Sequence, residues 1–156
     1  MAVAQARAAV LRHPGRGLAR LEHVRRLKFL DLKGCPLDDE SLVFPAGMRK
    51  LVRLDLSGTN ASGRGLASLE HCTTLKSLDL KSCPLDDDAI ERVRQFESLQ
   101  TLDLARTPTD DARLQRLAPL VLLRSLNLSD TDVSDAGLAA LAGMRDLAWL
   151  KLDRTF

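Results

Sequence analysis

The stretch LKSLDLKSCPLDDDAI, residues 75–90, joins three leucines at spacings of three and two to a Cys-Pro-Leu segment and a run of acids. Taken alone, it predicts a short strand followed by a turn. The same pattern recurs, because Leu-x-x-Leu-x-Leu segments begin at six leucines that are 24 residues apart. These leucines are Leu27, Leu51, Leu75, Leu99, Leu123 and Leu147. A fixed period of this length is typical of a solenoid, in which repeats stack into one continuous core.

The second half of each repeat is also regular. With the first leucine of a repeat counted as position 1, apolar residues recur at positions 16, 19 and 22, which predicts a helical or 3₁₀ segment with one apolar face. Position 12 holds Asp or Ser in all five complete repeats, and we expect its side-chain oxygen to cap this segment. Acids in the first turn suit the positive end of a helix dipole. We therefore interpret the run Asp86–Asp88 as a helix start, rather than as a metal or acid–base site.

These units resemble the leucine-rich repeat family, whose pattern LxxLxLxx(N/C)xL they follow over nearly the whole chain. Segments such as residues 126–144 are most similar to bacterial 24-residue repeats, including those of plant-pathogen effector proteins. The resemblance implies an α/β solenoid with a curved parallel sheet on its concave face and short helices on its convex face. One departure lies at position 9, where Cys or Thr replaces the frequent Asn. A thiol or hydroxyl there can still bond the buried loop backbone.

The repeats divide the chain into two parts. We expect residues 1–26 to form a degenerate N-terminal capping repeat, with His13-Pro14-Gly15 as its turn. The leucine-rich repeats follow over residues 27–156, as the units 27–50, 51–74, 75–98, 99–122, 123–146 and the partial unit 147–156. The last unit leaves an exposed edge strand at Leu147–Leu152, which predicts an edge-strand dimer, continuation of a longer chain, or fraying.

Composition limits the classes of partner and compartment. The formal net charge is only +2, but residues 1–26 hold six Arg against one Glu. No apolar run approaches the roughly 18 residues that a membrane span needs. Three cysteines without a CxxC spacing predict reduced thiols and a cytoplasmic setting; delivery into a host cell as an effector is the alternative.

The resemblance places the x positions of LxxLxL on the concave face and so implies where a partner binds. The partner-binding residues expected there are Phe29, Asp31, Arg53, Asp55, Lys76, Asp79, Lys81, Asp103, Arg124, Trp149 and Lys151. Position 5 is Asp in four consecutive repeats, an aspartate column that is either habitual to such repeats or a recognition stripe for a basic segment. Trp149 is expected to be a partner contact or to shield the end of the core.

The sequence therefore predicts a non-enzymatic scaffold that binds a protein or peptide. His23 and His71 lie two repeats apart and no nucleophile accompanies them, so we expect no catalytic site, metal, cofactor or small-molecule substrate. One alternative is the substrate-recognition fragment of a larger effector or ubiquitin-ligase adaptor. Another is attachment to nucleic acid or acidic membrane through Arg7, Arg12 and Arg16, although the aromatic residues that stack on bases are missing there.

Overall fold

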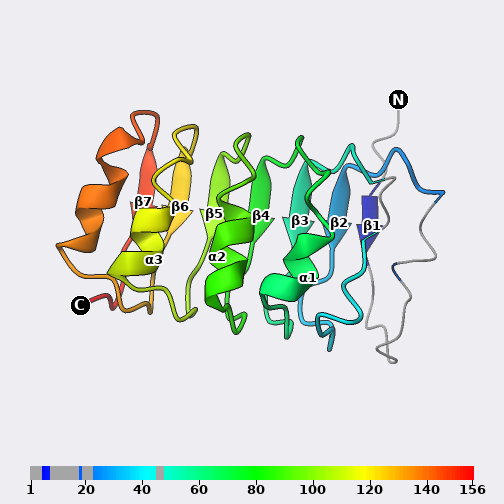
Figure 1. Cartoon of the computed structure of the whole chain (residues 1–156), viewed down its shortest axis with the longest axis horizontal. Helices are drawn as coiled ribbons and strands as arrows, with labels where there is room; N and C mark the ends of the chain where they lie inside the picture. The colour runs from blue at the N-terminus through cyan, green and yellow to red at the C-terminus, as the bar shows by residue number, and fades with distance from the viewer. Residues whose placement is uncertain (1–4, 8–17, 19–22, 45–47) are drawn as a thin grey trace.

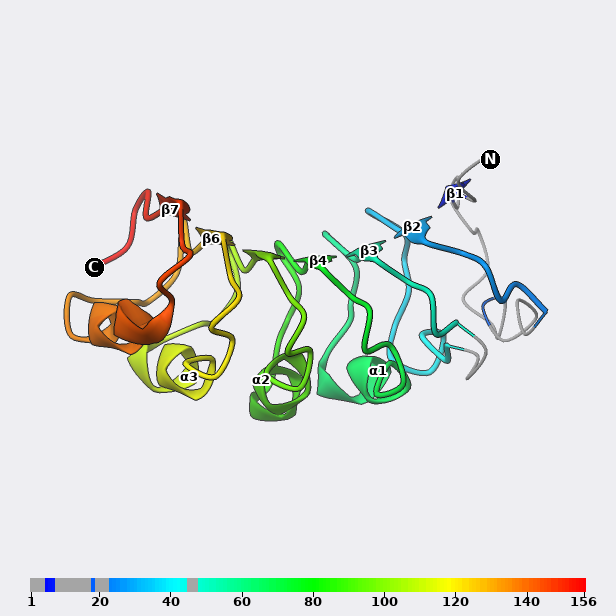
Figure 2. The same cartoon turned by 90° about the horizontal axis from the view of Figure 1, so that it is seen from above.

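The computed structural model describes residues 5–7, 18, 23–44 and 48–156, which form repeats stacked side by side (Figure 1) and curved into an arc when seen from above (Figure 2). Its described residues contain one sheet of seven short parallel strands in chain order. The strands are β1 (Gln5–Arg7), β2 (Phe29–Asp31), β3 (Arg53–Asp55), β4 (Ser77–Asp79), β5 (Thr101–Asp103), β6 (Ser125–Asn127) and β7 (Trp149–Lys151). The described helical segments are α1 (Gly63–Ala67), α2 (Asp87–Val93), α3 (Asp111–Arg116) and the 3₁₀ helix η2 (Gly137–Gly143).

The sheet lines the inner side of the arc. Figure 2 shows the strands along the concave side and the helices along the convex side. Each strand pairs with the next at an offset of 24 residues, so that Phe29, Arg53 and Ser77 are neighbours. β1 joins at the same offset, with Gln5 beside Phe29. The expected leucine-rich solenoid is confirmed, whereas most of the capping repeat expected over residues 1–26 lies outside the described residues.

Leucine side chains fill the space between the two faces. Within one repeat Leu75, Leu78 and Leu80 are each at most 1% exposed, and Ile90 and Val93 of α2 meet them from the convex side. Full burial of one such side chain contributes about 1.5–3 kcal/mol. The core is built almost wholly from aliphatic residues, since aromatic residues make up only 3% of the sequence.

Aspartate at position 12 caps its own repeat, as the sequence predicts. Asp86 Oδ1 accepts the N–H of Ala89 at 2.8 Å, and Asp110 Oδ1 accepts the N–H of Arg113 at the same distance. Asp38 accepts the N–H of Ser41 in the same way, although the segment that follows it is a turn.

Serine at position 12 behaves differently: the prediction is wrong at Ser62, whereas Ser134 Oγ accepts the N–H of Ala136 at 3.2 Å. Ser62 is the N-cap residue of α1, but its side chain makes no hydrogen bond to the helix. Asp39 of the preceding repeat caps α1 instead: its Oδ1 accepts the N–H groups of Ser62 at 2.7 Å and Gly65 at 3.0 Å. The Ser62 hydroxyl donates to Asp39 Oδ2, so it holds the carboxylate in place.

The same arrangement returns in the unit 123–146. η2 begins at Gly137 after Ala136, not after Ser134. Asp111 Oδ1 accepts the Ser134 N–H at 2.8 Å, and the Ser134 hydroxyl donates to Asp111 Oδ2 at 2.6 Å. These bonds to Ser134 lower the pKa of the Asp111 carboxyl. We call the two arrangements cross-repeat caps.

Cross-repeat caps require glycine at position 15. A Cβ added to Gly65 or Gly137 would overlap the carboxylate of Asp39 or Asp111, respectively. In the repeats where an aspartate caps its own helix or turn, position 15 is not glycine but Ser41, Ala89 or Arg113.

A tight bend follows each strand. Position 8 is in the left-handed conformation in every repeat, with φ between 56° and 68° at Gly34, Gly58, Ser82, Arg106, Asp130 and Arg154. The next residue closes the bend: Thr59 and Thr107 donate their hydroxyls to the carbonyls of Leu56 and Leu104 at 2.7 and 2.6 Å. The predicted hydrogen-bonding role of position 9 is thus confirmed.

The thiols take part in the same packing. Cys35, Cys72 and Cys83 are all buried. Cys83 Sγ lies 3.1 Å from the carbonyl oxygen of Leu56. Burial raises the pKa of the Cys72 and Cys83 thiols, which keeps them protonated.

Core leucines become exposed at β7. Leu150 is 38% exposed, whereas its counterpart Leu126 in β6 is completely buried. Phe156 is 84% exposed, and its N–H donates to the carbonyl of Val133 at 3.1 Å. Whether this edge dimerises, continues into a longer chain or frays stays a prediction.

Candidate functional site

The aspartate column runs along the middle of the concave face. The strand register places Asp31, Asp55, Asp79 and Asp103 side by side, followed by Asn127. Their neighbours in the strands, such as Leu54 and Leu78, point into the core, so the column points away from it. All four carboxylates are half-buried, because adjacent repeats pack against both sides of each.

One oxygen of each carboxylate has a structural partner. Asp79 Oδ1 accepts the N–H of Lys81 at 3.0 Å, and Asp103 Oδ1 accepts the N–H of Ala105 at 2.9 Å. The remaining members of the column repeat this bond to the backbone two residues on, at 2.9–3.1 Å for Asp31, Asp55 and Asn127. The aspartates therefore hold the bend after each strand, which leaves the Oδ2 oxygens of Asp55 and Asp79 for a partner molecule.

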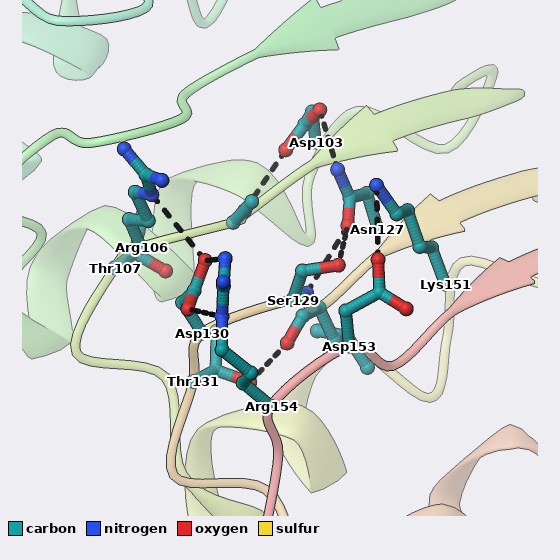
Figure 3. Close-up of polar contacts among 12 residues, drawn as sticks. Asp103, Arg106, Thr107, Asn127, Ser129, Asp130, Thr131, Lys151, Asp153 and Arg154 are labelled. Atoms are coloured by element: carbon teal, nitrogen blue, oxygen red, sulfur yellow. Dashed lines mark hydrogen bonds and ion pairs between the residues drawn. The ribbon is translucent and has the colours of Figure 1, made fainter.

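The column is electrostatically coupled along its length. Burial raises the pKa of Asp79, and repulsion from Asp55 and Asp103 raises it further. The coupling is relieved at one end, where Asn127 Nδ2 donates to Asp103 Oδ2 at 2.9 Å (Figure 3). The amide of Asn127 therefore follows the four aspartates and donates a hydrogen bond to the last of them, Asp103.

Two rows of basic side chains flank the column. Position 2 carries Lys28, Lys76 and Arg124, and position 7 carries Lys33 and Lys81 on the other side; all five are exposed. We call these residues the flanking rows. Arg53, within β3, is exposed as well. Among the described residues, none of these six side chains forms an ion pair, whereas Lys151 Nζ lies 3.1 Å from Asp153 Oδ2.

The two aromatic residues of the concave face differ in exposure. Trp149 in β7 is 51% exposed, whereas Phe29 in β2 is half-buried. They lie on strands at opposite ends of the run from β2 to β7, as the repeat pattern predicts. Their role in binding a partner stays a prediction.

A charged ladder along the bends was missed from the sequence. Asp130 lies between two arginines: Arg106 Nε is 3.3 Å from its Oδ2, and Arg154 Nη2 donates to the same oxygen at 2.8 Å (Figure 3). The bond from Arg154 is the main cause of the lowered pKa of Asp130. The signal was available, because Arg, Asp and Arg stand 24 residues apart at position 8.

The convex face offers no cluster for catalysis or metal binding in the part of the chain that the structure describes. No group of three or more His, Cys, Asp or Glu side chains converges there. His71 pairs only with the adjacent Glu70, at 3.4 Å. A groove between α3 and η2 is lined mostly by alanines, with Asp111 at its edge already engaged in a cross-repeat cap. The predicted role of Arg7, Arg12 and Arg16 lies outside the described side chains.

Comparisons with known proteins agree with this fold. The sequence model of the family described as Leucine Rich repeat matches residues 71–92 and 121–142. A sequence search of curated proteins gave no match. One similar solved structure is an internalin, inlF, from Listeria monocytogenes, with a TM-score of 0.65 and 22% identity over 88% of this chain and 44% of that chain. Internalin C2 from the same organism has a TM-score of 0.61 and 22% identity over 87% of this chain and 66% of that chain.

A third similar structure is the functional domain of InlJ from Listeria monocytogenes, described as including a cysteine ladder. It has a TM-score of 0.60 and 19% identity, over 85% of this chain and 26% of that chain. The chain therefore spans less than half the length of the inlF and InlJ structures. The chain thus has the fold of a leucine-rich repeat solenoid, and its resemblance to bacterial proteins with such repeats is confirmed. Among its described residues, no helix combines the length and apolar content needed to cross a bilayer.

Proposed function

We propose that the concave face is a binding surface for a protein or peptide and that the protein acts without catalysing a reaction. The observation that carries the proposal is the exposure of Arg53 and Trp149 on a sheet whose backbone is already ordered by its neighbours. Trp and Arg are the residues most enriched among interface hot spots. Because the sheet is preformed, binding to it forfeits little conformational entropy.

The proposal includes two forms of this binding role. The chain serves either as a self-standing scaffold or as the recognition part of a larger effector or adaptor protein. The chain matches only part of the length of the internalin structures. That similarity supports a role as an interaction domain but does not identify the partner. The cytoplasmic setting remains an expectation from the reduced thiols.

A capture experiment with matched variants tests the proposal. Wild-type protein is immobilised, source-cell lysate is passed over it, and bound proteins are identified by mass spectrometry. A concave variant, Arg53→Ala with Trp149→Ala, is run beside a control, Arg64→Ala with Val121→Ala. The control removes an exposed arginine and an exposed apolar residue from outside the concave face.

We expect a protein that wild type and control retain and that the concave variant loses. Circular dichroism and thermal unfolding of all three proteins establish that each is folded. A partner retained equally by the concave variant would refute the assignment of binding to this face.

A further inference from the structure

Three arginines on the convex side lie close to carboxylates, whereas a set of six cations on the concave face does not, among the described residues. On the convex side, Arg113 Nε lies 2.9 Å from Asp87 Oδ1, and Arg94 Nε lies 3.1 Å from Glu91 Oε2. Arg116 also lies within 4.0 Å of Asp87 and Glu91. The flanking rows and Arg53 have no such carboxylate partner among the described residues, although four aspartates run between them. The concave face thus holds unpaired positive charge above a column of negative charge.

The depth of the two kinds of charge decides which one a partner meets first. The column is half-buried and gives one oxygen of each carboxylate to the bend that follows its strand. The six basic side chains are exposed, and long cationic chains extend their charged ends into water. They outnumber the four aspartates, so the outer layer of this surface is positive.

The spacing of the rows suits a polypeptide that crosses the strands. Lys28, Lys76 and Arg124 stand in alternate repeats, as do Lys33 and Lys81. Strands about 4.8 Å apart separate alternate repeats by about 10 Å, which is the length of about three residues of extended chain. In an extended segment, side chains three residues apart point to opposite sides. Carboxylates at every third residue would therefore meet basic side chains of the two rows in alternation.

We infer that the concave face binds an acidic protein segment that runs across β2 to β6, with its carboxylates on the flanking rows and its backbone N–H groups toward the aspartate column. This inference rests on the proposed function and names the partner's chemistry. A peptide matches both layers, because it carries acidic side chains and neutral N–H donors at once. The Oδ2 oxygens of Asp55 and Asp79 are the acceptors for those donors, since that of Asp103 already accepts from Asn127.

The same two layers fit a nucleic acid poorly. A phosphate backbone laid between the rows would face the aspartates directly, and like charges at this distance repel. Binding of single strands also relies on aromatic side chains that stack on successive bases. The concave face offers Phe29 and Trp149 only at its two ends, with four strands between theirs.

Fluorescence anisotropy with three labelled probes tests the inference. The first is a peptide of about 10 residues with Glu at every third position, long enough to cross the rows at about 3.3 Å per residue. The second carries Lys at the same positions, and the third is an oligothymidylate of the same total charge as the first. Each is titrated with wild type, with Lys76→Glu plus Lys81→Glu, and with a convex control, Arg64→Glu plus Arg94→Glu.

We expect the Glu peptide to bind wild type and the convex control alike, and to bind the concave charge reversal about tenfold more weakly. Its affinity should fall as salt is added, because exposed charges are screened. The inference is overturned if the Lys peptide binds more tightly, if the oligothymidylate matches the Glu peptide, if the reversal has no effect, or if the Glu peptide fails to bind. Circular dichroism establishes that each variant is folded.

A second comparison separates this inference from the proposed function. The protein captured from lysate is titrated against the same charge-reversed variant. If capture needs Arg53 and Trp149 but tolerates Lys76→Glu with Lys81→Glu, the concave binding surface stands and the acidic partner is refuted. If capture is insensitive to every concave substitution, both proposals fail together.

Discussion

Replacing Asp79 by Asn is expected to stabilise the folded protein at neutral pH. Asp79 lies in register between Asp55 and Asp103. At a spacing of about 4.8 Å and an effective dielectric constant of 20 to 80, each pair costs about 1–3 kcal/mol before screening. Lys33 offsets part of this repulsion, and the side chain is only partly buried. We therefore expect the free energy of unfolding to rise by about 1 kcal/mol.

Asparagine preserves the structural bond that the carboxylate makes. Its Oδ1 can accept the Lys81 N–H, as Asn127 Oδ1 accepts the Ser129 N–H at 3.1 Å. Asp79→Ala lacks that acceptor and should be less stable than Asp79→Asn by about 1 kcal/mol. The comparison separates relief of repulsion from loss of the bend.

Urea unfolding at neutral and acidic pH measures the effect and its sign. The folded-state pKa of Asp79 is raised, so its protonated form favours folding, and stability from this group is lost as pH rises through that pKa. The gain from Asp79→Asn should therefore vanish at acidic pH. Asp146→Asn, in an exposed loop outside the column, serves as the control. A folded Asp79→Asn protein with an unchanged or lower urea midpoint at neutral pH would refute the reasoning.

Two further predictions concern the caps and the thiols. Gly137→Ala should lower the free energy of unfolding by about 1–3 kcal/mol, because the new Cβ overlaps the Asp111 carboxylate; Gly143→Ala has open space and should change it by less than about 0.5 kcal/mol. Equal thermal midpoints for the two variants would contradict the cross-repeat cap. Cys72 and Cys83 should react with a thiol reagent only slowly until urea unfolds the protein, since both are buried and protonated. Fast labelling of the native protein would show that the packing around them is wrong.

The sequence predicted most of the fold because the repeat pattern reports burial directly. Leu75, Leu78 and Leu80 had to share one face, and the 24-residue step placed their counterparts on neighbouring strands. The caps could be predicted only in part. Within a single repeat, serine and aspartate are equally good N-cap residues. In the structure, however, Asp39 reaches into the next repeat and caps its helix in place of Ser62.

The candidate site was predictable in position and not in chemistry. Periodicity placed Asp79 and Lys81 on one face, but it gave no measure of their depth. The half-buried carboxylate and its bond to the Lys81 backbone depend on the pitch of the bend, which three-dimensional packing sets. The ladder of Arg106, Asp130 and Arg154 was not predicted, because the direction of a position-8 side chain depends on the left-handed φ that this position adopts in all six repeats.

The cross-repeat caps restrict the order in which the repeats can follow one another. An aspartate at position 13 serves the serine and glycine of the unit that follows, so each cap is shared by two 24-residue units. The unit 51–74 needs an aspartate before it but has Gly63 at its own position 13. It can follow a neighbour that supplies the carboxylate, yet it cannot follow a copy of itself without leaving Ser62 of the second copy uncapped. Duplication or exchange of single units in this chain is therefore constrained by sequence order, even though every unit has the same length.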